Sequence, residues 1–250
     1  MKIAALQLDI AWENRLLNYS RVKEFAEQAR AASADILVLP EMFATGFSLN
    51  PEITAEEPDG PTVRFLSSMA QDLNMGVIAG VAFKAPANKA QNCAVIFDKS
   101  GKHIITYTKM KLFSFAGEER THIRGESPVT FQVEGLKASC FICYDLRFPS
   151  LFQMVSKQCD VIFVIASWPK TRRSHWNILL PARAVENQLY VVGVNRVGAG
   201  GGLTYDGDTQ IISPLGVQIV QAHGEQLVYG EIDPTVVKKV RDDLPFIKDR

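Results

Sequence analysis

The sequence predicts an α/β fold, and three observations support that prediction. Short apolar runs rich in Val, Ile and Phe recur along the chain, and their length suits strands that are buried on both faces. Helical patterns separate several of these runs, which is the alternation typical of α/β proteins. In the C-terminal third only turn-like segments separate the apolar runs, which predicts an antiparallel meander that closes the sheet.

The expected elements follow this pattern in chain order. Strands are expected over the apolar runs at residues 3–8, 36–39, 77–83, 93–97, 138–142, 161–166 and 191–194, and in the meander at 210–212, 217–220 and 227–232. Helices are expected at 22–29 and, after Pro61, at 66–73, where apolar side chains recur at helical spacing, and also at 150–157 and 176–188. Pro181 falls inside the last of these and is expected to kink or shorten it.

No linker, charge block, low-complexity tract or repeat divides the chain. We therefore expect a single domain over residues 1–250, with roughly the last 10 to 15 residues as a partly extended C-terminal arm. The glycine-rich segment at 198–208 lacks the Lys-Ser/Thr of a phosphate-binding loop and is expected to be a flexible loop.

The charge balance narrows the class of partner. Lys and Arg number 27, as do Asp and Glu, so no overall field attracts nucleic acid or an anionic membrane. No apolar run approaches the roughly 20 residues that cross a bilayer, and the N-terminal residues lack the apolar core of a signal peptide. We expect a cytoplasmic protein that binds a small molecule or another protein, with no nucleic-acid or membrane partner.

The four cysteines are expected as free thiols in that compartment. Cys140 and Cys143 form a C-x-x-C pair, but zinc needs a second ligand pair, and neither Cys93 nor Cys159 has a Cys or His neighbour at ligand spacing, so no metal site is expected. Cys140 lies within an apolar strand and is interpreted as core. Cys143 follows that strand and precedes a helix, where backbone N–H groups favour a thiolate or an oxyanion. Its position is typical of a nucleophile, and another buried cysteine is the alternative.

Two further segments carry candidate chemistry. Glu41 follows the apolar run at 36–39, at the strand edge where open α/β sheets usually place their sites, and a carboxylate there suits a general base. A salt-bridged glutamate at a strand end is the alternative. Lys109 and Lys111 flank Met110 and would point to the same side of an extended segment, where either could stabilise negative charge or simply be solvated.

Three segments together resemble, in order and spacing, the signature blocks of the nitrilase superfamily of carbon–nitrogen hydrolases. They are Leu39-Pro40-Glu41-Met42-Phe43, Tyr107-Thr108-Lys109-Met110-Lys111-Leu112-Phe113 and Cys143-Tyr144-Asp145-Leu146-Arg147-Phe148-Pro149. The resemblance covers essentially the whole chain, and Trp168-Pro169 and His175-Trp176 point to the bacterial omega-amidases within the superfamily. It implies a four-layer α-β-β-α sandwich.

The resemblance also implies catalytic roles. It makes Glu41 the general base, Lys109 the stabiliser of the oxyanion and Cys143 the nucleophile, and it matches the second glutamate of the family to Glu118, next to Glu119. The implied reaction is hydrolysis of a linear amide through a cysteine thioester, aided by the lysine cation, which favours the thiolate. No metal or organic cofactor is required, and the implied assembly is a homodimer.

The implied substrates are monoamides of 2-oxo dicarboxylates, namely 2-oxoglutaramate and 2-oxosuccinamate, whose far carboxylate needs a cation. The substrate-binding residues expected around the nucleophile are Tyr144, Phe43, Phe113, Trp168, Arg172, Arg173 and His175. A structural or surface role is the alternative for each of them. The segment at 198–208 is expected to gate the entrance.

Other functions compete with this interpretation. Within the superfamily the alternatives are a deaminated-glutathione or N-carbamoyl amide hydrolase, and then a nitrilase. A catalytically inactive scaffold or binding protein is an alternative of another class. A redox protein using Cys140 and Cys143 is a third, although two residues at this spacing on one strand face opposite sides, which hinders a disulfide.

Overall fold

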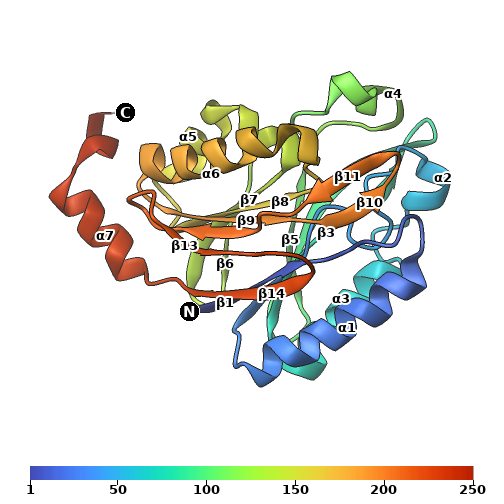
Figure 1. The fold of residues 1–250 in the computed structure, drawn as a ribbon, viewed down its shortest axis with the longest axis horizontal. Helices are drawn as coiled ribbons and strands as arrows, with labels where there is room; N and C mark the ends of the chain where they lie inside the picture. Colours follow the sequence, from blue (N-terminus) through green and yellow to red (C-terminus); the bar gives the residue numbers. More distant parts are fainter. Residues whose placement is uncertain (250) are drawn as a thin grey trace.

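Two six-stranded sheets pack face to face at the centre of the molecule, and helices cover their outer faces (Figure 1). The computed structural model describes residues 1–249. One apolar cluster fills the space between the sheets, and a second lies between the first sheet and its helices. The predicted α-β-β-α sandwich is confirmed.

The first sheet has the strand order β14-β1-β2-β3-β4-β5. β1, β2 and β3 are parallel, and the other pairings are antiparallel. The strands are β1 (Lys2–Gln7), β2 (Ile36–Val38), β3 (Gly76–Ala85), β4 (Lys89–Phe97), β5 (His103–Thr108) and β14 (Gln226–Glu231).

The second sheet has the order β13-β12-β9-β8-β7-β6, with β7, β8 and β9 parallel. Its strands are β6 (Thr130–Val133), β7 (Leu136–Ile142), β8 (Val161–Ala166), β9 (Tyr190–Asn195), β12 (Gln210–Ile212) and β13 (Gln218–Gln221). Every residue of β8 and β9 is buried, which explains why the sequence there is apolar without alternation.

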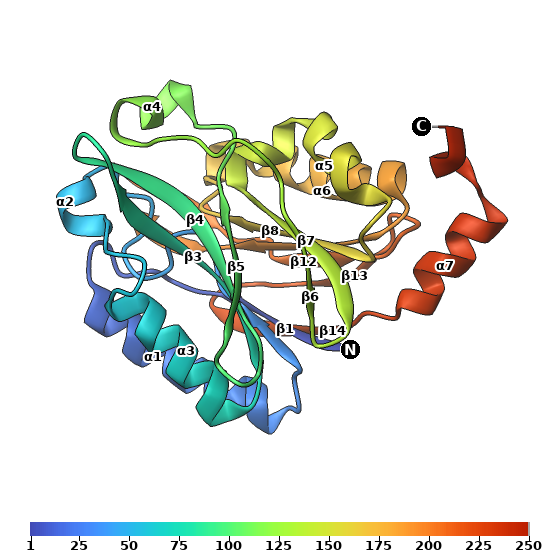
Figure 2. The same cartoon turned by 180° about the vertical axis from the view of Figure 1, so that it is seen from behind.

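Helices α1 (Arg15–Ala31) and α3 (Pro61–Leu73) cover the first sheet, and α5 (Pro149–Ser156) and α6 (Arg173–Asn187) cover the second (Figures 1 and 2). α6 continues through Pro181, so the proline does not shorten it. The short elements are α2 (Pro51–Thr54), α4 (Glu118–Thr121) and the 3-10 turns η1 (Ser114–Ala116), η2 (Cys143–Arg147), η3 (Lys170–Arg172) and η4 (Phe246–Asp249).

Two expectations about the C-terminal third are wrong. The predicted meander does not stay in one sheet, because β14 crosses to the first sheet and pairs with the open edge of β1. The segment expected as a flexible loop is a hairpin of β10 (Val197–Gly200) and β11 (Leu203–Asp206). Backbone pairing between the two strands gives this glycine-rich segment its order.

The C-terminal tail is mostly helical. α7 (Pro234–Asp243) and η4 project from the body of the sandwich (Figure 2). Arg241 anchors α7 by donating hydrogen bonds to the carbonyls of Ser156 and Cys159, at 2.9 Å each. Within residues 1–249, no helix combines the length and the apolar character that crossing a membrane requires.

Candidate active site

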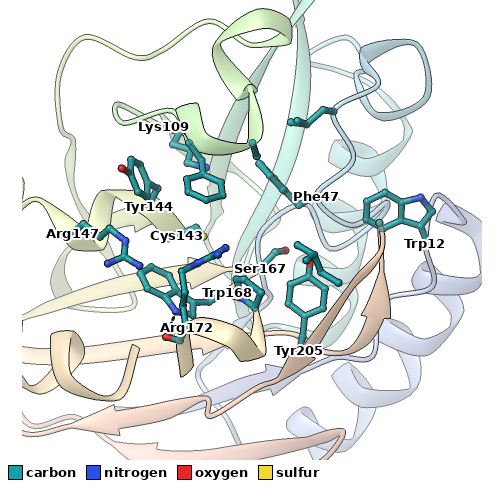
Figure 3. Close-up of a pocket in the computed structure, with 16 residues that line it drawn as sticks. Trp12, Phe47, Lys109, Cys143, Tyr144, Arg147, Ser167, Trp168, Arg172 and Tyr205 are labelled. Atoms are coloured by element: carbon teal, nitrogen blue, oxygen red, sulfur yellow. Dashed lines mark hydrogen bonds between the residues drawn. The ribbon is translucent and has the colours of Figure 1, made fainter. Parts of the chain in front are cut away.

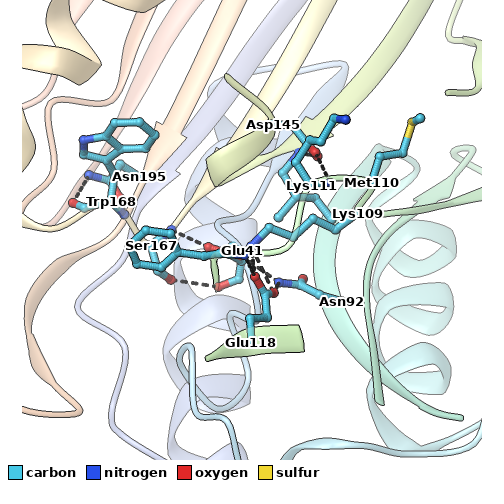
Figure 4. Close-up of polar contacts among 12 residues, drawn as sticks. Glu41, Asn92, Lys109, Met110, Lys111, Glu118, Asp145, Ser167, Trp168 and Asn195 are labelled. Carbon is cyan, nitrogen blue, oxygen red and sulfur yellow. Dashed lines mark hydrogen bonds and ion pairs between the residues drawn. The ribbon is translucent and has the colours of Figure 1, made fainter. Parts of the chain in front are cut away.

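Four segments end or turn at one place between the two sheets. Figure 4 shows Glu41, Lys109 and Glu118, which three of these segments carry. Glu41 follows β2, Lys109 follows β5, and Glu118 begins the short helix α4. Cys143 follows β7 in the opposite sheet and opens the turn η2. Residues distant in sequence therefore meet at the carboxyl ends of their strands, where open α/β sheets place their sites.

Lys109 is held between two carboxylates and is fully buried. Its Nζ lies 3.1 Å from Oε1 of Glu41, and 3.0 and 2.9 Å from the two carboxylate oxygens of Glu118. Burial acts to lower the pKa of Lys109, but the carboxylates of Glu118 and Glu41 outweigh it and raise the pKa above its ordinary value. Lys109 is therefore a fixed cation.

Lys111 does not join Lys109 between the carboxylates. β5 ends at Thr108, so the strand alternation that would point both lysines to the same side does not extend to them. Its Nζ lies 5.0 Å from the centre of the Phe148 ring. Its backbone N–H, rather than its charge, takes part in the polar contacts around the site.

Glu41 is buried and accepts hydrogen bonds from three directions. Besides Lys109, the side-chain amide of Asn92 donates to Oε1 at 2.7 Å, and the backbone N–H of Ser167 donates to Oε2 at 2.8 Å. Asn92 also donates to Glu118 at 3.2 Å, so one neutral amide contacts both carboxylates. These contacts fix the orientation of the carboxylate toward the centre of the site.

Glu118, not its neighbour Glu119, reaches the lysine. Gly117 adopts φ +78°, a left-handed conformation that turns the chain into α4, and the backbone N–H of Phe113 donates to Glu118 at 2.5 Å. Burial acts to raise the pKa of Glu118, but Lys109 and the hydrogen bonds outweigh it and lower the pKa. Glu119 is exposed to solvent.

Cys143 sits on a strained turn with φ +46°, an uncommon conformation for a residue with a side chain. Burial and then the neighbouring Glu41 charge raise the pKa of its thiol well above the ordinary value, and Lys109 only partly opposes them. Lys109 therefore favours the thiolate, as expected, but does not outweigh burial and the charge of Glu41.

The other cysteines lie in the core. Cys140 is fully buried within β7, as expected, and Cys93 and Cys159 are also buried. All four cysteines have free thiols, and no disulfide joins Cys140 to Cys143.

Asp145 connects the Cys143 turn to the segment that carries Lys111. Its buried carboxylate accepts hydrogen bonds from the hydroxyl of Tyr107 at 2.8 Å, the backbone N–H of Lys111 at 2.8 Å and the backbone N–H of Ile142 at 3.0 Å. Burial raises the pKa of Asp145 to about 6, against the partial opposition of these donors. Nothing in the sequence singled Asp145 out except its place two residues after Cys143.

A cavity of about 320 Å³ opens next to Cys143 and Lys109 (Figure 3). Four of the seven expected substrate-binding residues line it: Phe113, Tyr144, Trp168 and Arg172. The guanidinium of Arg172 lies over the Phe113 ring, 5.2 Å from its centre. These residues form a mixed aromatic and cationic wall, typical of small-molecule sites.

The structure does not bring Phe43, Arg173 or His175 to this cavity. Phe43 is fully buried, because the turn after Glu41 directs it into the apolar cluster beside Tyr19. Arg173 points to Asp208, to which it donates two hydrogen bonds. His175 is exposed, and its Nδ1 contacts the guanidinium of Arg147 at 3.1 Å.

Several other lining residues were missed, among them Arg147, Phe47, Trp12 and Tyr205. Arg147 lies within the Cys143 block, one helical turn after the nucleophile, and that spacing was the signal available. Phe47 lines the cavity in place of Phe43, with its ring centre 5.0 Å from Nζ of Lys109. Trp12 and Tyr205 reach the cavity from distant segments. The glycine content of residues 198–208 was the one signal for Tyr205, and Trp12 left none.

Comparisons with known proteins identify the family of this chain. The family model described as "Carbon-nitrogen hydrolase" matches residues 2–242. The chain is 33% identical to the 2-oxoglutaramate amidase of Bacillus subtilis, over 99% of this chain and 96% of that one. It is 30% identical to the omega-amidase YafV of Escherichia coli K12, over 100% and 96% of the two chains.

A solved structure shows the same fold. It is the crystal structure of XC1258 from Xanthomonas campestris, described as a CN-hydrolase superfamily protein with an arsenic adduct in the active site. The two structures superimpose with a TM-score of 0.93 and share 29% sequence identity, over 100% of this chain and 97% of that one. The fold and the relatives lead to one conclusion: this chain belongs to the carbon–nitrogen hydrolase family of the nitrilase superfamily and is an amidase similar to the omega-amidases.

Proposed function

We propose that the enzyme hydrolyses the terminal amide of small 2-oxo dicarboxylate monoamides, such as 2-oxoglutaramate and 2-oxosuccinamate, to the acid and ammonia. The observation that carries the proposal is a pair of arginines, Arg147 and Arg172, in the cavity that also holds Cys143. The names of the relatives, 2-oxoglutaramate amidase and omega-amidase, support it.

The two arginines lack an anionic partner. No acidic side chain within residues 1–249 forms an ion pair with either guanidinium; Arg147 stacks on Trp168, 4.7 Å from the ring centre, and Arg172 on Phe113. Burial lowers the pKa of Arg147, and the charge of Arg172 lowers it further. A substrate carboxylate would relieve this repulsion and accept charge-assisted hydrogen bonds.

The first half of the reaction forms a thioester. Glu41 takes the proton of the Cys143 thiol, and the sulfur attacks the amide carbonyl. The developing oxyanion lies against the ammonium of Lys109 and the backbone N–H of Tyr144. The carbon–nitrogen bond then breaks, and Glu41 returns the proton to the departing ammonia.

The second half releases the acid. Glu41 takes a proton from a water molecule, which attacks the thioester; the carbon–sulfur bond breaks, and Glu41 returns the proton to the Cys143 sulfur. Glu118 keeps Lys109 charged and in place through both halves, because it contacts Nζ with both oxygens. Glu41 thus moves the protons, Cys143 carries the acyl group, Lys109 holds the oxyanion and Glu118 holds Lys109, and no metal or organic cofactor takes part in any step.

We also propose that the enzyme is a homodimer that associates through α5 and α6. Their outer faces expose large apolar side chains, with 58% of Met154, 66% of Ile178 and 52% of Val185 accessible. Ile178→Lys should shift the molecular mass measured by light scattering from dimer to monomer. An unchanged dimer would place the interface elsewhere, and a monomeric wild type would refute the proposal.

The direct test of the reaction is ammonia release from 2-oxoglutaramate by wild type and by Cys143→Ala. An N-carbamoyl amine, deaminated glutathione and an aliphatic nitrile belong in the same panel. Turnover of 2-oxoglutaramate that disappears in Cys143→Ala supports the proposal. Preference for another compound would move the substrate to that class, and no turnover at all would favour an inactive scaffold.

A further inference from the structure

The cavity has two chemically different halves, one on each side of Cys143 (Figure 3). We call the side with Arg147 and Arg172 the charged half. The opposite side, which we call the apolar half, holds the uncharged side chains of Trp12, Phe47 and Tyr205. Gly201 and Leu203, which also line the cavity, belong to the same β10–β11 hairpin as Tyr205. A short dicarboxylate monoamide would place its carboxylate in the charged half, and this leaves the apolar half without a function.

The apolar half is a built feature and not a gap between loops. The β10–β11 hairpin packs so closely on Trp12 that a Cβ at Gly200 or at Gly201 would lie 2.6 Å from the indole ring, so only glycine fits at these positions. Behind the hairpin, the buried guanidinium of Arg196 lies 4.5 Å from the centre of the Tyr205 ring and holds that ring in the wall. The glycine content of the hairpin therefore serves close packing around the cavity.

We propose that the apolar half receives an unbranched alkyl group carried on the amide nitrogen, so that the enzyme also cleaves secondary amides whose leaving group is an apolar primary amine. The inference rests on the proposed function, in which the acyl chain extends toward Arg147. The acyl chain and the nitrogen diverge from the tetrahedral carbon bound to the Cys143 sulfur. The nitrogen substituent then points toward Phe47 and the hairpin.

The character of this half selects the leaving group. Burial of alkyl carbons against Trp12, Phe47 and Leu203 is favourable, because it removes apolar surface from water. A carboxylate on the leaving group would be desolvated there without a cation to pair with it, because Arg147 and Arg172 lie on the other side of Cys143 and the guanidinium of Arg196 is fully buried behind the Tyr205 ring. Apolar amines are therefore favoured over amino acids or peptides.

The chemistry is the same two-step exchange. The carbon–sulfur bond forms and the carbon–nitrogen bond breaks, while the thiol proton passes through Glu41 to the departing alkylamine. Water then hydrolyses the thioester. In the reverse reaction, a neutral primary alkylamine attacks the thioester and its proton passes through Glu41 to the sulfur. The products are a secondary amide and the free thiol.

The test compares 2-oxoglutaramate with its N-propyl amide in wild type, Leu203→Asp and Thr204→Asp. Leu203 is 43% exposed, so an aspartate at this position is compatible with folding, and Thr204 is its exposed neighbour on the alternate face of β11. The quantity compared is the kcat/KM for propylamine release divided by the kcat/KM for ammonia release. In wild type we expect the two values to lie within about tenfold of each other. The ratio should fall by at least about tenfold in Leu203→Asp and stay unchanged in Thr204→Asp.

Two results would overturn the inference. One is a ratio that is the same in Leu203→Asp as in wild type. The other is preferential cleavage of an unbranched fatty-acid primary amide that Leu203→Asp abolishes, because the apolar half would then hold the acyl chain.

A second measurement separates this inference from the proposed function. If neither compound is cleaved, the proposed substrate is wrong. The apolar half can still be tested by measuring whether 1-butanol slows the alkylation of Cys143 by iodoacetamide. Protection in wild type and Thr204→Asp that is lost in Leu203→Asp supports an alkyl site. Lack of protection in wild type overturns it.

Discussion

Nζ of Lys109 lies 2.9 Å from a carboxylate oxygen of Glu118, and neither side chain has more than 1% of its surface exposed. Glu41 contacts the same ammonium at 3.1 Å. Two buried carboxylates thus share one cation, and the stability of the site and its chemistry depend on the same atom.

Lys109→Met should remove both activity and stability. Loss of the oxyanion donor alone costs about 100- to 1,000-fold in kcat, and the two carboxylates left without their cation should lower the free energy of unfolding by about 3 to 5 kcal/mol. Denaturant unfolding and ammonia release measure the two effects. The double variant Lys109→Met/Glu118→Gln should recover part of the stability and none of the activity; recovery of activity would refute the role of Lys109.

Glu41→Gln should separate thiol ionisation from turnover. The Glu41 charge raises the pKa of Cys143 while Lys109 opposes it, so removal of the charge should lower that pKa and make a thiolate at lower pH than in wild type. Turnover should nevertheless be lost, because no group remains to protonate the leaving nitrogen. The pH dependence of ultraviolet thiolate absorbance, with Cys143→Ala as the blank, tests the shift. An upward shift would contradict this account.

Arg147→Leu and Arg172→Leu should each weaken the binding of a substrate with a far carboxylate. A hydrogen-bonded charge pair contributes about 1.5 to 3 kcal/mol, so kcat/KM for 2-oxoglutaramate should fall roughly 10- to 100-fold, mostly through KM. Lys170→Met is the matched control, since Lys170 pairs with Asp206 outside the cavity lining. Equal losses on an amide without a carboxylate would show that the arginines act on the fold and not on the substrate.

Asp145→Asn should lower activity while the chain still folds. Asn has one acceptor oxygen, so its NH2 group would face either the N–H of Lys111 or the donors Tyr107 and Ile142, and the nucleophile turn should shift. We expect a loss in kcat of about tenfold or more. An unchanged kcat would show that the turn does not depend on this carboxylate.

The pH dependence of stability should report the same carboxylate. The folded pKa of Asp145 is raised to about 6 from an ordinary 3.8, so the folded state binds the proton more tightly than the unfolded state between these values. The contribution of Asp145 to the free energy of unfolding should therefore fall by about 3 kcal/mol as the pH rises from about 4 to about 6. The difference in unfolding free energy between wild type and Asp145→Asn should show this slope, and a flat or rising difference would contradict it.

The local sequence is sufficient for the features that depend on neighbouring residues. Apolar runs such as residues 161–166 are strands because burial on both faces leaves no place for polar alternation. Glu41 and Cys143 come shortly after such runs, and this alone places both residues at strand ends. The resemblance of the three blocks to the nitrilase superfamily then supplies the α-β-β-α arrangement.

Tertiary structure alone decided the features that depend on distant contacts. β14 pairs with β1, more than two hundred residues earlier, and no local pattern specifies which sheet edge a late strand will join. Phe47 rather than Phe43 faces the cavity because the turns after Glu41 break the strand alternation. Side-chain direction in irregular turns depends on the packing around them, whereas the strand runs themselves follow from the burial of consecutive residues.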